Sequence, residues 1–113
     1  MSKKKIRANF RNAVYKRDNY TCKICGHKPA KEVYLEELDA HHITDRNEMP
    51  NGGYVKENGI TLCCVGNNCH LKAEKFHQNN GEEWYENMHP NDLYVLISST
   101  KALAIEKSYQ LRK

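Results

Sequence analysis

The sequence predicts a small α+β fold with two short strands, a helix that follows them, and further helices at both ends. Apolar residues recur at helical spacing in residues 6–18 and again after residue 90. Between these segments, apolar and polar residues alternate in residues 38–44, and a second apolar run ends at a cysteine in residues 55–63. Cysteines stand before and after the two predicted strands, which indicates that a bound metal ion holds these segments together.

The size and composition of the chain limit what it can be. At 113 residues, we expect residues 1–113 to form one domain. Only 39% of the residues are hydrophobic and the mean hydropathy is −0.87, so the core is thin and a metal staple would stabilise it. No apolar stretch is typical of a signal peptide or a membrane span. We therefore expect a cytoplasmic protein with no membrane partner, whose reduced cysteines bind metal rather than form disulfides.

Charge is distributed unevenly along the chain. Residues 1–31 contain ten Lys or Arg and a single acid, whereas residues 32–113 contain eight bases and thirteen acids. A concentrated basic segment attracts the phosphate backbone of a nucleic acid. A solvated helix face with a solubilising tail explains the same charge equally well, so charge alone does not decide between the two.

The N-terminal segment is predicted to form a basic arm and then a basic helix. We expect residues 1–5, which include three consecutive lysines, to be a disordered arm. An amphipathic helix over residues 6–18 would pack on the core through a stripe that includes Phe10 and Val14. Four basic residues lie mostly elsewhere around this helix: Arg7, Arg11, Lys16 and Arg17.

Two groups of cysteines have the spacing of zinc ligands. Cys22 and Cys25 are three residues apart, and the glycine after Cys25 tolerates the conformation that lets both thiolates reach one ion. The second pair comprises Cys69 and either Cys63 or Cys64; we favour Cys63, because it ends the second predicted strand. Four thiolates close the coordination sphere, so this zinc would be structural. The alternative is a metal-free fold with buried thiols, which the four-cysteine pattern disfavours.

Residues 38–44 and 55–63 are predicted to form an antiparallel hairpin with a long connection, preceded by a turn or short strand in residues 32–37. Side chains alternate between the faces of a strand, so the adjacent His41 and His42 point in opposite directions. Asp39 shares a face with His41 and is a candidate partner for its ring, which the pattern alone does not decide. Because the two histidines face different ways, one can bind a metal ion while the other faces a water molecule.

Two helices are predicted after the hairpin. The first covers residues 70–78 and is capped by Asn68, with three residues along one face: His70, Glu74 and His77. The second lies in a C-terminal extension over residues 82–113. It runs from Leu93 to Leu111 with Asn91 as its cap, and a Ser-Ser-Thr run weakens its centre and could split it.

Four segments of the chain occur in the order typical of a known nuclease family. They are Tyr20-Thr21-Cys22-Lys23-Ile24-Cys25-Gly26, Ala40-His41-His42-Ile43, Asn58-Gly59-Ile60-Thr61-Leu62-Cys63 and Cys69-His70. Over roughly residues 10–78 the chain therefore resembles the zinc-containing HNH endonucleases, which have the ββα-metal, or His-Me finger, fold. The resemblance implies that residues 20–78 form the zinc-bound ββα core of an HNH nuclease domain.

The resemblance also implies a role for each matched residue. His42 would be the general base, and His41 and His70 would bind a catalytic divalent ion. Asn58 would fix the loop and orient the base. Where some members carry a further histidine one turn after His70, this chain has Glu74, whose carboxylate suits Mg²⁺ or Mn²⁺ but is equally well explained as a solvated acid. The next candidate on this helix, His77, is expected to be structural.

The sequence as a whole predicts a metal-dependent endonuclease that hydrolyses DNA, either by nicking one strand or by cutting both strands as a homodimer. The resemblance also allows restriction, homing or phage-packaging roles within a larger assembly. The basic residues of the first helix (Arg7, Arg11, Lys16 and Arg17) would bind flanking phosphates without reading the sequence. The alternative is a non-catalytic zinc module that binds nucleic acid or a protein partner. It explains the cysteines and the basic segment, but it has no use for the histidines and Asn58 together.

Overall fold

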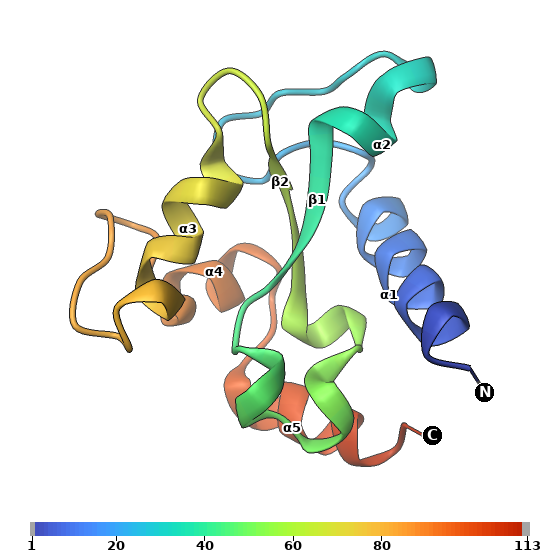
Figure 1. The fold of residues 1–113 in the computed structure, drawn as a ribbon, viewed down its shortest axis with the longest axis vertical. Helices are drawn as coiled ribbons and strands as arrows, with labels where there is room; N and C mark the ends of the chain where they lie inside the picture. The colour runs from blue at the N-terminus through green and yellow to red at the C-terminus, as the bar shows by residue number, and fades with distance from the viewer. Residues whose placement is uncertain (1, 112–113) are drawn as a thin grey trace.

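A two-stranded antiparallel sheet lies at the centre of the computed structural model, which describes residues 2–111 (Figure 1). Strand β1 is Leu38–His42 and strand β2 is Gly59–Cys63, and Leu38 pairs with Cys63 at one end of the ladder. Helix α1, Lys3–Arg17, and helix α3, Cys69–Gln78, contact the hairpin from opposite sides. The predicted α+β fold with its antiparallel hairpin is thus confirmed. Residues 1, 112 and 113 of the predicted arm and C-terminal extension lie outside the described residues.

Helix α1 begins earlier than predicted. The side chain of Ser2 accepts a hydrogen bond from the backbone N–H of Lys5 at 3.2 Å and caps the helix. Lys3, Lys4 and Lys5 therefore form the first turn of α1, and the prediction of a disordered arm is wrong for them. The buried face of α1, which includes Val14, packs tightly on the sheet. A Cβ atom at Gly59 would lie only 2.5 Å from a methyl group of Val14.

A partly buried ion pair between Arg17 and Asp18 fastens the end of α1 to β2. The Arg17 guanidinium donates two hydrogen bonds of 2.8 Å to the carboxylate of Asp18, which is buried and also accepts the backbone N–H of Thr61 at 2.9 Å. Arg17 donates further to the carbonyl oxygens of Lys56 and Gly59. Because these bonds use most of its N–H groups, Arg17 is a structural residue here, and its predicted role as a phosphate ligand is not supported by its position.

The segments around the strands are mostly helical turns. Helix α2, Tyr34–Glu37, precedes β1 in the region where the sequence left a turn or a short strand open. The long connection between the strands contains three 3₁₀ turns: Arg46–Glu48, Pro50–Gly53 and Lys56–Asn58. Among the described residues, the core gathers apolar side chains from both strands and from the flanking helices, including Ile43, Ile60, Leu62, Leu93 and Tyr94.

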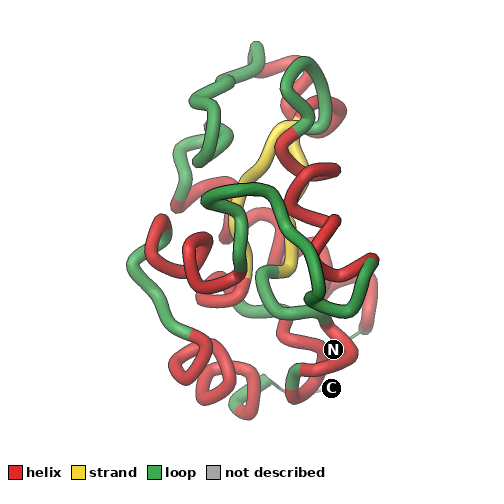
Figure 2. Tube along the Cα trace, turned by 90° about the vertical axis from the view of Figure 1, so that its left-hand side faces the viewer, coloured by secondary structure: helices red, strands yellow, loops and turns green. Residues whose placement is uncertain are grey.

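The C-terminal region contains two helices rather than one. Helix α4 is Pro90–Leu96 and helix α5 is Lys101–Tyr109, with a break at Ser98, whose φ of 56° is left-handed. His89, and not the predicted Asn91, caps α4, and Thr100 caps α5. Figure 2 shows the strands enclosed by helices and loops. Within the described residues, every helix is too short or too polar to cross a membrane.

Candidate active site and metal centres

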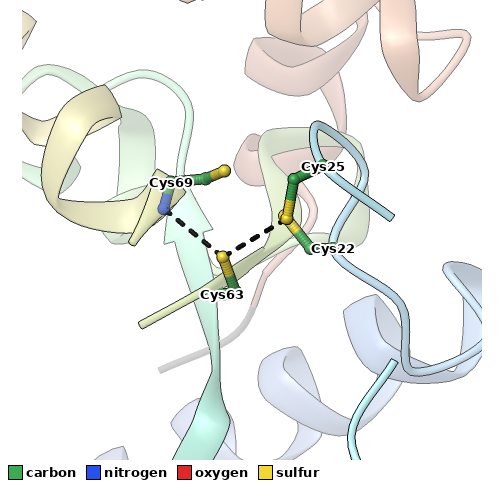
Figure 3. Close-up of side chains that lie close together, drawn as sticks. All are labelled: Cys22, Cys25, Cys63 and Cys69. Carbon is green, nitrogen blue, oxygen red and sulfur yellow. Dashed lines mark hydrogen bonds between the residues drawn. The ribbon is translucent and has the colours of Figure 1, made fainter. Parts of the chain in front are cut away.

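Four cysteines meet where the turn after α1, the end of β2 and the start of α3 come together (Figure 3). The sulfur atoms of Cys22, Cys25, Cys63 and Cys69 all lie within 4.8 Å of one another, and none forms a disulfide. Cys25 Sγ is 3.6 Å from Cys63 Sγ. A tetrahedral zinc ion with Zn–S bonds of about 2.3 Å separates its sulfur ligands by about 3.8 Å, whereas a disulfide bond is about 2.05 Å long. The cluster therefore fits a structural zinc site.

The fifth cysteine lies outside this cluster. Cys64 Sγ donates to the carbonyl oxygen of Glu36 at 3.2 Å, and the backbone N–H of Cys64 donates to Glu37 at 2.9 Å. Cys63, the residue favoured from the sequence, is therefore the one that joins the cluster. Burial and the neighbouring Cys22 raise the pKa of the Cys69 thiol. A thiolate at this position would need a nearby cation, which zinc would supply.

A second cluster joins β1 to α3. Oε1 of Glu74 lies 3.1 Å from Nδ1 of His41 and 3.4 Å from Nε2 of His70, and the three donor atoms lie within 4.8 Å of one another. His41 is only 1% exposed, yet its Nδ1 has no aligned hydrogen-bond partner among the described residues. In an octahedral site with bonds of about 2.1 Å, adjacent ligand atoms are about 3.0 Å apart. The cluster therefore fits a small divalent ion.

The protonation of these groups follows from their surroundings. Burial lowers the pKa of His41, although Glu74 opposes the shift, so the ring is neutral and has a lone pair to offer. Burial also lowers the pKa of His70, but Glu74 and Asp39 outweigh it and the net pKa is raised. The contacts with His41 and His70 hold the pKa of Glu74 well below its usual range.

Asp39 contacts a different ring from the one considered in the sequence. Its Oδ2 lies 3.2 Å from Nδ1 of His70, and so it pairs with His70 rather than with His41. A carboxylate in this position fixes the tautomer of an imidazole and directs the other nitrogen toward a metal ion. For His70 that other nitrogen is Nε2, the atom that faces Glu74.

His42 points away from His41 and is enclosed by aromatic rings. Its ring centroid lies 4.6 Å from that of Phe10 and 4.7 Å from that of Tyr54. Burial lowers its pKa to about 4, well below the ordinary histidine value of about 6.5. The ring is therefore neutral at physiological pH, and its buried Nε2 has no hydrogen-bond partner in the described part of the chain.

The histidine-carboxylate cluster and the ring of His42 line one cavity of about 340 Å³, although they come from different faces of β1 and from α3. It is lined by His41, His42, His70 and Glu74, together with Asp39, Asp45, Arg46, Tyr54 and His77. The ring of His77 stacks on His41 at 5.4 Å, and its Nε2 lies 3.1 Å from the backbone oxygen of His42. These contacts agree with the structural role expected for His77.

Asn58 does not line the cavity but holds its edge in place. Its side chain is fully buried and forms a pair of 3.0 Å hydrogen bonds with the backbone N–H and carbonyl of Thr44. Its amide also donates to the carbonyl oxygen of Gly53, and its oxygen accepts the hydroxyl of Tyr94 at 2.7 Å. These bonds tie the chain just after His42 to the loop before β2.

Several residues that line the cavity could not be predicted from sequence patterns. Arg46, Asp45 and Tyr54 lie in the irregular connection between the strands, where no periodic pattern predicts which side chains face inward. Of the basic residues expected to bind phosphates, Arg7, Arg11 and Lys16 are exposed on α1. Arg7 lines a neighbouring groove, which is shared with Tyr54.

The fold and the two clusters define a small ββα-metal protein with one cysteine centre and one histidine-carboxylate centre. Residues 22–76 match the family model described as HNH endonuclease. The match runs from the first cysteine, through both strands, into α3, and this part of the chain is thus similar to the HNH endonuclease family. No curated protein and no solved structure matches the chain.

Proposed function

We propose that this protein is a metal-dependent HNH endonuclease that hydrolyses phosphodiester bonds in DNA. One observation carries the proposal: the rings of His41, His42 and His70 and the carboxylate of Glu74 line a single cavity of about 340 Å³. A purely structural site would not need three imidazoles and a carboxylate around an open cavity. A phosphodiester with its attacking water fits such a space.

The proposed cofactors are two kinds of metal ion. Zinc on Cys22, Cys25, Cys63 and Cys69 would hold the turn after α1, the end of β2 and the start of α3 together. Mg²⁺ or Mn²⁺ on His41, His70 and Glu74 would supply positive charge to the phosphate as negative charge develops during hydrolysis. Asp39 would keep the His70 ring in the tautomer that leaves Nε2 free to bind.

His42 is the proposed general base. Its ring is neutral at physiological pH, so it can accept a proton from the attacking water. A pKa near 4 makes a weak base, but a bound phosphate is an anion and stabilises the protonated ring, so substrate binding raises this pKa. The rings of Phe10 and Tyr54 hold the imidazole, and Asn58 fixes the loop behind it. The expected products carry a 5′ phosphate and a 3′ hydroxyl.

A non-catalytic zinc module that binds nucleic acid or protein is the second candidate. The observation that favours it is the enclosure of His42, whose Nε2 is buried and contacts no hydrogen-bond partner among residues 2–111. If that nitrogen never reaches water, the zinc-stapled scaffold and its basic helix could serve binding alone. The nuclease proposal instead requires that substrate or metal binding open this nitrogen to water.

A plasmid-nicking assay separates the two candidates. Supercoiled DNA is incubated with the zinc-loaded protein and with Mg²⁺ or Mn²⁺, and wild type is compared with His42→Ala. The matched control is His27→Ala, because His27 is partly exposed, pairs with Glu37 at 2.8 Å and lies outside the cavity. We expect His42→Ala to lower the rate about 100-fold or more and the control to change it little.

Equal cutting by wild type and His42→Ala would remove His42 as the base. No cutting by wild type with either ion would favour the binding module. The form of the product addresses the number of active sites. Nicked circles indicate single-strand cleavage, whereas direct appearance of linear DNA indicates the proposed homodimer.

A further inference from the structure

Two arginines from distant parts of the chain converge on Tyr54, at the edge of the active-site cavity. Arg46 comes from the turn after β1 and Arg7 from the second turn of α1, and both are exposed. Burial alone raises the pKa of Tyr54, but hydrogen bonds from Arg46 and Arg7 outweigh it and the net pKa is lowered. Neither guanidinium pairs with a carboxylate within 4 Å anywhere in residues 2–111.

The position of the Tyr54 ring is fixed from several sides. It meets the ring of His42 edge to face at 4.7 Å and that of Phe10 at 5.7 Å. It also covers Gly52 so closely that a Cβ atom there would lie 2.6 Å from the ring. The hydroxyl group therefore sits at a defined point, and it holds the two arginines beside the proposed base.

Tyr54 separates the active-site cavity from a second groove. The first cavity is lined by Tyr54 and Arg46, and the second, of about 620 Å³, by Tyr54, Arg7 and Lys3. The two spaces therefore meet at the tyrosine. A polymer that enters the active site can continue past Tyr54 into the groove along the first turns of α1.

Both signs of charge occur in this region. The lining of the cavity includes Asp39 and Glu74, which suit a cation, and also the positively charged Arg46, while Arg7 lies in the neighbouring groove. Asp45 lines the same cavity and, after Tyr54, contributes to raising the pKa of Arg46, but the described residues contain no ion pair between Asp45 and Arg46. Each guanidinium has five N–H donors and a phenol oxygen has at most two lone pairs, so most of the donors stay free for an anion. The guanidinium groups of Arg46 and Arg7, one in each of the two spaces that meet at Tyr54, can bind the oxygens of a phosphate.

We propose that Arg7, Arg46 and Tyr54 form a phosphate-binding subsite for the nucleotide next to the cleaved bond, and that the groove lined by Lys3 takes the continuing strand. This inference rests on the proposed nuclease function for its location, but the binding it predicts is measured independently. Tyr54 acts here as a positioning residue, because it holds both guanidinium groups and contacts no reacting atom.

The test is fluorescence anisotropy with the full zinc-loaded chain and a labelled DNA duplex, without added Mg²⁺, Mn²⁺ or chelator, so that the DNA stays intact. Arg46→Ala and Arg7→Ala are compared with Lys101→Ala, which removes the same charge from an exposed position on α5. We expect each arginine variant to weaken binding about tenfold or more, because it removes charge-assisted hydrogen bonds. Each should also reduce the salt slope of log K by about one, while the control stays within about twofold of wild type.

Tyr54→Phe tests the positioning role. This substitution keeps the ring that packs on His42 and removes only the hydroxyl group. Its effect on affinity should be smaller than that of Arg46→Ala, and the two effects should not add in the double variant. Additive effects would overturn the role of Tyr54.

The outcomes distinguish this inference from the proposed function. If Arg46→Ala binds DNA like Lys101→Ala and keeps the wild-type salt slope, the subsite is overturned even if the protein nicks plasmid. If wild type nicks nothing but Arg46→Ala still loses affinity and salt slope, the subsite stands and the nuclease proposal fails. Zinc content and circular dichroism of each variant establish that it is folded.

Discussion

Replacing Asn58 with alanine should destabilise the fold before it affects any chemistry. The substitution leaves the N–H and carbonyl groups of Thr44 and the carbonyl group of Gly53 without their buried side-chain partner. The Tyr94 hydroxyl keeps its contact with Thr44 Oγ1 at 2.7 Å and so loses less. At about 1–3 kcal/mol for each unsatisfied buried group, three groups together cost about 3–5 kcal/mol if partial relaxation is allowed. The total free energy of unfolding of a domain of this size is about 5–15 kcal/mol.

Urea unfolding of the zinc-loaded protein, followed by circular dichroism, measures this cost. Tyr94→Phe is the matched control, because it removes one hydrogen bond to Asn58 and keeps the buried ring; we expect it to cost about 1 kcal/mol. The loop-fixing role predicts that stability and nicking fall together in Asn58→Ala. The reasoning is refuted if the free energy of unfolding of Asn58→Ala lies within about 1 kcal/mol of that of wild type and nicking is nevertheless lost. The carboxamide would then act at the substrate.

Two further predictions concern the metal ions. Mass spectrometry should find one zinc ion per chain in wild type and in Cys64→Ser, but none in Cys63→Ser. The reason is that Cys63 belongs to the sulfur cluster and Cys64 does not. Zinc loss in Cys64→Ser instead would show that the ligand set is wrong. The affinity for Mn²⁺, measured by calorimetry, should fall about tenfold per pH unit below the raised pKa of His70, since His70 must lose its proton to bind metal. Asp39→Asn removes one cause of the raised pKa and should move this fall to lower pH; an affinity independent of pH from about 6 to 8, around the ordinary histidine pKa, would exclude His70 as a ligand.

Regular parts of the fold were predictable because local patterns and packing agree there. The alternation in β1 and the apolar run in β2 gave the hairpin, and Asn68 caps α3 as expected, with its side chain 3.3 Å from the N–H of Leu71. Helix ends were less predictable, because single side chains decide them. Ser2 extends α1 by a turn, and His89 caps α4 through a capping box with Asp92 that spacing rules do not anticipate.

The candidate site was predictable only where its residues lie on regular elements. His41, His70 and Glu74 come together because β1 and α3 have fixed geometries, and the family resemblance supplied the order. Arg46 and Tyr54 lie in the connection between the strands, whose path depends on the buried hydrogen bonds of Asn58. The low pKa of His42 results from burial beneath the rings of Phe10 on α1 and Tyr54 in the connection between the strands. The sequence of β1 alone does not predict this burial.

The direct succession of Cys69 and His70 limits how this gene can change. One residue anchors the sulfur cluster and the next belongs to the histidine-carboxylate cluster, both in the first turn of α3. Inserting a single residue between them would turn His70 by about 100° around the helix axis and shift it by about 1.5 Å along it. One of the two centres would then be lost, so changes in length should be tolerated in the turn before Cys69 but not between Cys69 and His70.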